Sequence, residues 1–154
     1  MRDPDLTPLD PAFKTVIRIR MALAAIPFVI GAIALEVADI LPTGLFLVPV
    51  LVLIIALVLT FPARRWAARG YDMGADRLRV VRGVLFRSDT VVPFGRVQHL
   101  DVEQGPLERA FGIARLVLHT AGTHNSSVTL PGLRWDDATA MRETIREHVK
   151  RETM

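Results

Sequence analysis

The sequence contains no cysteine, which excludes disulfides and thiolate metal sites. It also has little lysine: two lysines and seventeen arginines stand against sixteen acidic residues, and the formal net charge is only +3. The high isoelectric point therefore reflects a surplus of arginine and not a polybasic tail. Because acidic residues interleave with the arginines and no aromatic platform accompanies them, the sequence gives no indication of nucleic-acid binding.

Patterns typical of catalysis and metal binding are missing as well. His99 and Asp101 share one face of a predicted strand, and His119 and His124 flank a predicted turn, but no HxH or HExxH spacing occurs. No serine stands at a known spacing from a base and an orienting acid. We therefore expect no metal, no cofactor and no enzymatic activity; a clustered polar pocket would be needed to support an enzyme.

Charge is nearly absent from residues 21–61, which contain two long apolar segments. In the second, LFLVPVLVLIIALVLTF at residues 45–61, fourteen of seventeen residues are Leu, Ile, Val or Phe and none is charged. At about −0.3 to −0.6 kcal/mol for each such residue, this segment favours membrane insertion by several kcal/mol. The first, Met21–Leu35, spans only ~22 Å of a ~30 Å hydrocarbon core, so it must extend on both sides.

The two segments predict a transmembrane hairpin over residues 16–63, with helices at about 17–37 and 44–62. Residues 1–15, rich in proline and aspartate, predict a disordered or loosely attached tail. Basic residues flank the hairpin on both outer sides: Lys14, Arg18 and Arg20 before it, and Arg64, Arg65 and Arg69 after it. The connection at residues 36–44 holds two acidic residues and no basic one. By the positive-inside rule, we expect a multi-pass protein of the cell membrane with both termini in the cytoplasm.

Two other interpretations of the first apolar segment are open. A signal peptide would have a similar basic flank and apolar core, but its removal would leave a bare tether before the second segment. A buried core helix would need a larger surrounding domain than the remaining residues can form. Both alternatives therefore fit less well than a first membrane helix.

The pattern changes between residues 69 and 150, where we expect a cytoplasmic domain. Apolar residues alternate with polar ones in six short segments separated by Gly and Pro turns, one of them at Val84–Val92. At the end of the chain, apolar residues recur at helical spacing: Trp135, Ala138, Met141, Ile145 and Val149. The sequence thus predicts a membrane-anchored α+β protein, in which a two-helix transmembrane hairpin precedes a β-sandwich or barrel capped by a C-terminal α-helix.

A spaced series of residues in this region resembles the bacterial PH-like, membrane-flanked domain family (YdbS-like), over roughly residues 44–149. The residues that carry the resemblance are Pro93, Arg96, Val97, Gln98, Gln104, Gly105, Pro106, Leu107, Arg109, Phe111, Gly112, Ala114, Leu116, Leu118, Thr120, Ala121 and Gly122. The resemblance implies a PH-like fold of two nearly orthogonal sheets, membrane attachment and no enzymatic chemistry. It also implies a companion membrane protein with several copies of the module, and it brings no defined ligand.

Two sets of residues are candidates for functional contacts. The first is the family motif, which we expect to shape a bend and a turn through backbone hydrogen bonds or to contact a partner: Pro93, Arg96, Gln98, Gln104, Gly105, Pro106, Arg109, Gly112, Thr120 and Gly122. The second could contact lipid headgroups, where each arginine gains about 1 kcal/mol near an anionic surface: Arg64, Arg65, Trp66, Arg77, Arg79, Arg82 and Arg87. The alternative for this second set is a solvated strand face paired with Asp76 and Asp89.

These features favour a non-enzymatic interaction module at the cytoplasmic face of the bilayer. Its expected partners are a companion PH-like membrane protein, a sister copy in a homo-oligomer, or lipid headgroups. The alternative is a small transport or channel subunit whose membrane helices carry the function, although no ionisable residue lies in the middle of either apolar segment.

Overall fold

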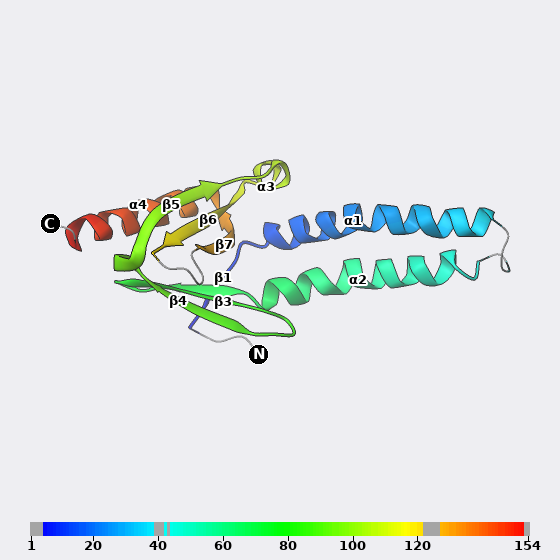
Figure 1. Ribbon diagram of the computed structural model, residues 1–154, viewed down its shortest axis with the longest axis horizontal. Helices are drawn as coiled ribbons and strands as arrows, with labels where there is room; N and C mark the ends of the chain where they lie inside the picture. The colour runs from blue at the N-terminus through cyan, green and yellow to red at the C-terminus, as the bar shows by residue number, and fades with distance from the viewer. Residues whose placement is uncertain (1–4, 39–41, 43, 122–126, 153–154) are drawn as a thin grey trace.

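Two long helices extend side by side from one end of a β domain (Figure 1). The computed structural model describes residues 5–38, 42, 44–121 and 127–152. Helix α1 covers Ala12–Val37 and α2 covers Leu47–Ala67, and both are long and apolar enough to cross a membrane. Only 17% of the apolar window of α1 and 6% of that of α2 is buried within the protein, whereas a core helix would be mostly buried. Exposure of this kind is what lipid-facing helices need.

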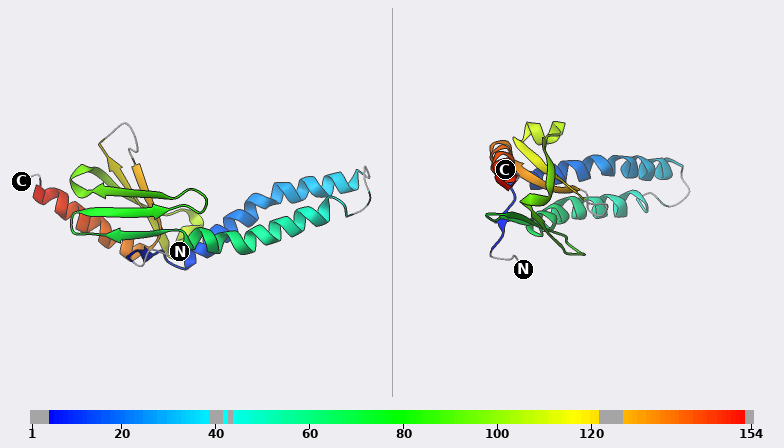
Figure 2. Two further views of the ribbon diagram at one scale, coloured as in Figure 1. Left: turned by 90° about the horizontal axis from the view of Figure 1, so that it is seen from below. Right: turned by 60° about the vertical axis from the view of Figure 1, so that its left-hand side comes forward.

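The β domain consists of two antiparallel sheets and a closing helix. The first sheet has the order β1 (Thr7–Pro8), β2 (Gly70–Met73), β3 (Arg77–Arg82) and β4 (Ser88–Pro93). The short helix η1 (Phe94–Arg96) leads to the second sheet: β5 (Val97–Glu103), β6 (Ile113–Thr120) and β7 (Ser127–Arg134), with α3 (Pro106–Ala110) between β5 and β6. The strands of the two sheets run in clearly different directions (Figure 2). This PH-like sandwich, capped by a C-terminal helix, confirms the predicted fold class.

Helix α4 (Trp135–Glu152) covers the sandwich and packs on η1, β5, β6 and β7. The buried cluster joins both sheets to this helix through Leu78, Val80, Val92, Phe94, Leu116, Leu118, Leu130, Ala138, Met141 and Ile145. Trp135, which we expected at the start of the apolar stripe of α4, is 43% exposed instead. The buried face of the helix therefore begins one turn later, at Ala138.

The segment before α1 belongs to this core, which contradicts the disordered tail predicted for residues 1–15. Thr7 and Pro8 extend the first sheet as strand β1, and the backbone N–H of Asp10 donates to the carbonyl of Gly132 at 2.8 Å. Leu9 of this segment is buried in the same cluster as the sheets, together with Phe13, Val16 and Ile17 of the first turns of α1. Composition suggested disorder, but these side chains supply enough buried apolar surface to order the segment. Residues 1–4 lie outside the described part of the chain.

Helix α1 begins five residues earlier than the sequence predicted. The side chain of Asp10 accepts a hydrogen bond from the backbone N–H of Ala12 at 2.8 Å, and Pro11 stands just before the helix. Aspartate followed by proline is a recognised signal for a helix start, because it satisfies an exposed N–H and fixes φ. The first turns of α1 therefore lie inside the β domain, and only the later turns leave it.

Strand β4 begins at Ser88 and not at Val84 as predicted. Gly83 has φ +127°, and a Cβ at this position would overlap the carbonyl oxygen of Phe86. The chain turns back on itself here, so Val84–Phe86 forms a loop between β3 and β4 instead of pairing with β3. The side chains of Leu85 and Phe86 are 87% and 89% exposed.

We expect Phe13→Ala to lower the free energy of unfolding of the β domain by about 3–5 kcal/mol, because it removes an aromatic side chain from the core. The matched control is Phe28→Ala on the same helix, where the side chain is 70% exposed. The measurement is chemical unfolding of both variants in detergent, followed by tryptophan fluorescence. Equal stability of the two variants would show that the segment is not part of the core.

Candidate functional site

A buried carboxylate holds the membrane hairpin against the β domain. Glu108 in α3 is 2% exposed, and its Oε1 accepts a hydrogen bond from Nη2 of Arg20 in α1 at 3.1 Å. Its Oε2 accepts the backbone N–H of Gly105 at 2.6 Å, and Nη2 of Arg115 in β6 lies 3.7 Å from the same oxygen. A buried charge is tolerated only with such partners. Glu108 therefore joins α1, α3 and β6 at one point.

The second helix is attached through Trp66. Its indole Nε1 donates to the carbonyl oxygens of Leu9 at 3.0 Å and Asp10 at 3.2 Å, and the Lys14 ammonium lies 5.8 Å from the ring centroid. We predicted Trp66 among the headgroup contacts, but the structure engages its indole N–H with the N-terminal segment. The two helices are thus fixed to the domain by Glu108 and by Trp66. We call this region, from Leu9 to Arg20 with Trp66 and Glu108, the joint.

Five arginines gather beside the joint, around the β3–β4 loop. Arg64 and Arg65 lie in the last turn of α2, Arg69 follows this helix, and Arg82 and Arg87 bracket the loop. They line two cavities that share Arg69, Gly83 and Val84, of about 410 Å³ and about 340 Å³. We call these five residues the arginine cluster. Arg69 was not among the predicted headgroup contacts, although its place after the apolar segment marked it as a flanking positive charge.

The positive charge of four arginines of this cluster is poorly compensated. Within the ranges that the structure describes, no carboxylate forms an ion pair with Arg64, Arg65, Arg69 or Arg82. Burial, together with the charges of Arg65 and Arg82, lowers the pKa of Arg69 to about 10. The guanidinium of Arg69 lies 5.5 Å from the ring centroid of Phe13, a cation–π contact that only partly offsets this repulsion. An arrangement of this kind is suited to binding an anion.

The remaining predicted headgroup arginines lie elsewhere. Arg79 makes a two-pronged contact with Asp89, with Nη2–Oδ2 at 2.6 Å and Nε–Oδ1 at 3.0 Å, and this contact lowers the pKa of the Asp89 carboxyl. Arg77 begins β3 and pairs with Pro93, at the end of the strand away from the loop. It lies five residue steps along the strand from Arg82, or about 16 Å. The arginines of this hairpin, which we predicted as one group, are therefore divided.

Part of the family motif shapes the turn that carries Glu108. Gln104 donates from Nε2 to the carbonyl of Ile113 at 2.9 Å, Gly105 donates its N–H to Glu108, and Pro106 is the first residue of α3. Gly112 has φ +65° at the return into β6. Gln104 and Gly105 thus hold this turn through hydrogen bonds, and Gly112 lets the chain return into β6.

The rest of the motif lies on the surface or beyond the described residues. Pro93 ends β4, and the carbonyl of Arg96 accepts the N–H of Ala121 at 3.2 Å. Thr120 pairs with Val97 in the second sheet. The side chains of Arg96, Gln98 and Arg109 are exposed, so contact of these residues with a partner stays a prediction. Gly122 lies outside the described residues.

The histidines of the second sheet face a carboxylate. Nε2 of His99 and Nε2 of His119 lie 3.0 Å and 3.3 Å from the two oxygens of Asp101. In the described part of the chain, no group of three or more His, Cys, Asp or Glu side chains is placed to hold a metal ion. The arrangement is that of two surface histidines beside one carboxylate, and His124 falls outside the described residues.

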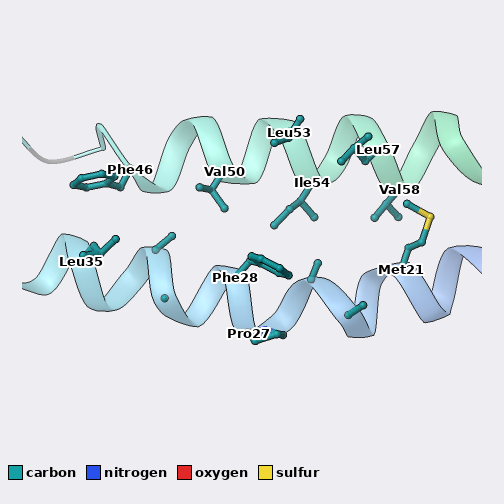
Figure 3. Close-up of a pocket in the computed structure, with 14 residues that line it drawn as sticks. Met21, Pro27, Phe28, Leu35, Phe46, Val50, Leu53, Ile54, Leu57 and Val58 are labelled. Atoms are coloured by element: carbon teal, nitrogen blue, oxygen red, sulfur yellow. The ribbon is translucent and has the colours of Figure 1, made fainter.

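An apolar groove of about 650 Å³ runs between the two helices. Figure 3 shows Phe28 of α1 and Ile54 of α2 pointing into the space between them. All of its lining residues are apolar. At the far end of the hairpin, Glu36 accepts backbone N–H groups of Gly44 and Leu47, which places this carboxylate at the start of α2 and away from mid-span.

Comparison with known proteins connects this architecture to a family. A family model described as "Bacterial PH domain" matches residues 21–149. Over 91 residues the chain is 30% identical to the UPF0699 transmembrane protein YdbS of Bacillus subtilis (strain 168), a match that covers 59% of this chain and 55% of that protein. The chain thus spans about half the length of this relative.

Among solved structures, the chain is similar to a DUF1696 family protein with a pleckstrin-homology domain from Shewanella loihica PV-4. The TM-score is 0.40 at 20% identity, and the match covers 53% of this chain and 70% of that chain. The family-model match spans both the hairpin and the β domain, so the resemblance seen in the sequence is confirmed.

We expect Arg20→Met to destabilise the protein by about 1–3 kcal/mol, because it leaves a buried carboxylate without its main charged partner. The control is Arg146→Met on α4, where the side chain is 62% exposed and lies 3.8 Å from Glu143; its effect should stay within about 0.5 kcal/mol. Thermal unfolding in detergent measures both. If Glu108→Gln added to Arg20→Met made the loss larger instead of smaller, the proposed pairing would be wrong.

Proposed function

We propose a non-enzymatic role for this chain, which belongs to the bacterial PH domain family. It is a membrane protein whose PH-like domain is held against the cytoplasmic face of the bilayer. There it binds a companion membrane protein with PH-like domains, a sister copy, or lipid headgroups. The orientation follows from the basic residues on both outer sides of the hairpin and the acidic connection between its helices.

The observation that carries this proposal is the joint. Arg20 reaches from α1 to Glu108, Trp66 reaches from α2 to Leu9, and only Ala68 and Arg69 separate α2 from β2. A flexible tether would let the domain present any face to the membrane, whereas this joint always presents the same one. Fixed orientation is useful to a module that binds at the membrane surface, because less rotational freedom is lost on binding.

The features of the site support binding over catalysis. The arginine cluster combines cations with the apolar loop, and it contains no nucleophile paired with a base. Nor does any observation favour a transport subunit, because the groove between the helices is lined by apolar residues alone. Small residues in this groove, such as Ala24, Ala25 and Gly31, would let a helix of a partner or a sister copy approach closely.

The topology can be tested with single cysteines, because the natural chain has none. We expect Pro42→Cys, at the closed end of the hairpin, to react with a membrane-impermeant maleimide in intact cells. Arg146→Cys, on the exposed side of α4, should react only after the membrane is permeabilised. The reverse pattern, or reaction of both positions in intact cells, would contradict a cytoplasmic domain.

The interaction can be tested on the full-length chain extracted from membranes in a mild detergent. We expect a membrane protein with PH-like domains, a second copy, or anionic lipid to remain bound, and mass spectrometry under native conditions identifies which. An extracted chain that is always a lipid-free monomer would contradict an interaction module.

A further inference from the structure

We propose that the β3–β4 loop inserts into the membrane leaflet beside the domain, and that the arginine cluster around it binds the phosphate of an anionic phospholipid. This inference rests on the proposed function, because it requires the domain to face the bilayer. It adds a ligand class and a set of contact residues to that function.

The first observation is the exposure of the loop. Leu85 and Phe86 are 87% and 89% exposed, whereas the other exposed large apolar residues of the β domain do not exceed 50%. The backbone enforces this arrangement, since the positive φ of Gly83 turns the chain and keeps residues 84–86 out of the sheet. Two almost fully exposed large apolar side chains at one loop tip are costly in water, at about 25 cal/mol for each Å².

The second observation is the position of the loop. Val84, Leu85 and Phe86 line the same cavity as Phe61 and Arg65 of α2. Figure 1 shows the end of the β3–β4 hairpin alongside the domain-side end of α2. Phe61 ends the long apolar segment and Arg65 lies one turn beyond it, so this level of α2 crosses from hydrocarbon to headgroups. A loop at the same level lies next to the leaflet. When its apolar side chains insert there, they leave water, and the free-energy cost of their exposure is removed.

The third observation is the charge around the loop. Arg65, Arg69 and Arg82 lie close enough to repel one another, and they have no carboxylate partner among the described residues. Burial lowers the pKa of Arg69, and the repulsion from Arg65 and Arg82 lowers it further. A phosphate group between these guanidiniums would relieve this repulsion through charge-assisted hydrogen bonds. The only phosphates always present at this depth belong to the lipids.

Leaflet lipid fits these observations better than a protein or a free anion. A soluble anion would account for the arginines but not for the apolar loop, and an apolar protein partner would account for the loop but not for the arginines. In the headgroup region, phosphate lies next to hydrocarbon. Arg82 meets the phosphate, and Leu85, three residues later in the chain, meets the hydrocarbon. The loop and the cluster therefore form one site.

Insertion of the loop is tested by quenching. The full-length chain with Leu85→Cys carries a fluorophore and is placed in vesicles of phosphatidylcholine and phosphatidylglycerol that contain lipids with a doxyl quencher on the acyl chain. The matched control is Ala75→Cys, an exposed position in the turn at the opposite end of the same sheet. We expect strong quenching at position 85 and little at position 75. Equal quenching at both positions would overturn insertion.

Lipid binding is tested by the enrichment of phosphatidylglycerol over phosphatidylcholine that stays with the chain after extraction in a mild detergent. Arg82→Gln should lower this enrichment about fivefold. Arg77→Gln, at the other end of β3, should leave it unchanged. An equal effect of both variants, or an enrichment that inorganic phosphate abolishes, would overturn a lipid phosphate site.

The outcomes separate this inference from the proposed function. If Arg146→Cys is labelled from outside the cell, both are wrong, because the domain is then not in the cytoplasm. If the topology holds and position 85 is not quenched, the domain faces the bilayer without inserting the loop, and only the inference fails. Retained β-sheet content in far-UV circular dichroism shows that each variant is folded.

Discussion

The packing of Leu9–Ile17 into the β domain is the constraint on which the rest of the structure depends. These residues are part of the core of the β domain, and from Ala12 onward they also form the first turns of the apolar helix α1. Because α1 continues from the core without interruption, no flexible residue separates the domain from the hairpin. The direction of the helices therefore sets the direction of the domain. The contact of Arg20 with Glu108 holds α1 in place, and the hydrogen bond of Trp66 to Leu9 holds α2.

This constraint explains why arginines with so little compensation can stand together. Arg64 and Arg65 belong to α2 and Arg82 to β3, so helix and sheet geometry fix their positions before any ligand binds. Repulsion among them can be accommodated because the apolar core of the joint holds the surrounding elements. In contrast, Arg79 meets Asp89 across neighbouring strands and forms an ordinary surface pair, which contributes little to stability or binding.

The sequence was sufficient to predict the fold and the pair of apolar helices. It was misleading where contacts between distant segments determine the local structure. Alternation and helical spacing are local patterns, so the PH-like sandwich and α4 were predictable, as was the turn that Gln104 and Gly105 shape. The ordered N-terminal segment was not, because its composition suggested disorder and its partner Gly132 is more than a hundred residues away. The attachment of Trp66 was not predictable either, because nothing local reveals that Leu9 supplies an acceptor for its indole N–H.

The β3–β4 loop shows why exposure must be judged against the solvent that a surface meets. Val84, Leu85 and Phe86 predicted a strand, because an apolar run in a β-rich region normally lies in a sheet. The glycine that precedes them overrides this tendency and turns the run outward. On a protein in water, such a loop would be a liability for aggregation. At the end of α2, beside Phe61 and between arginines, the same side chains match the boundary between hydrocarbon and headgroups, and their exposure becomes a reason to place lipid there.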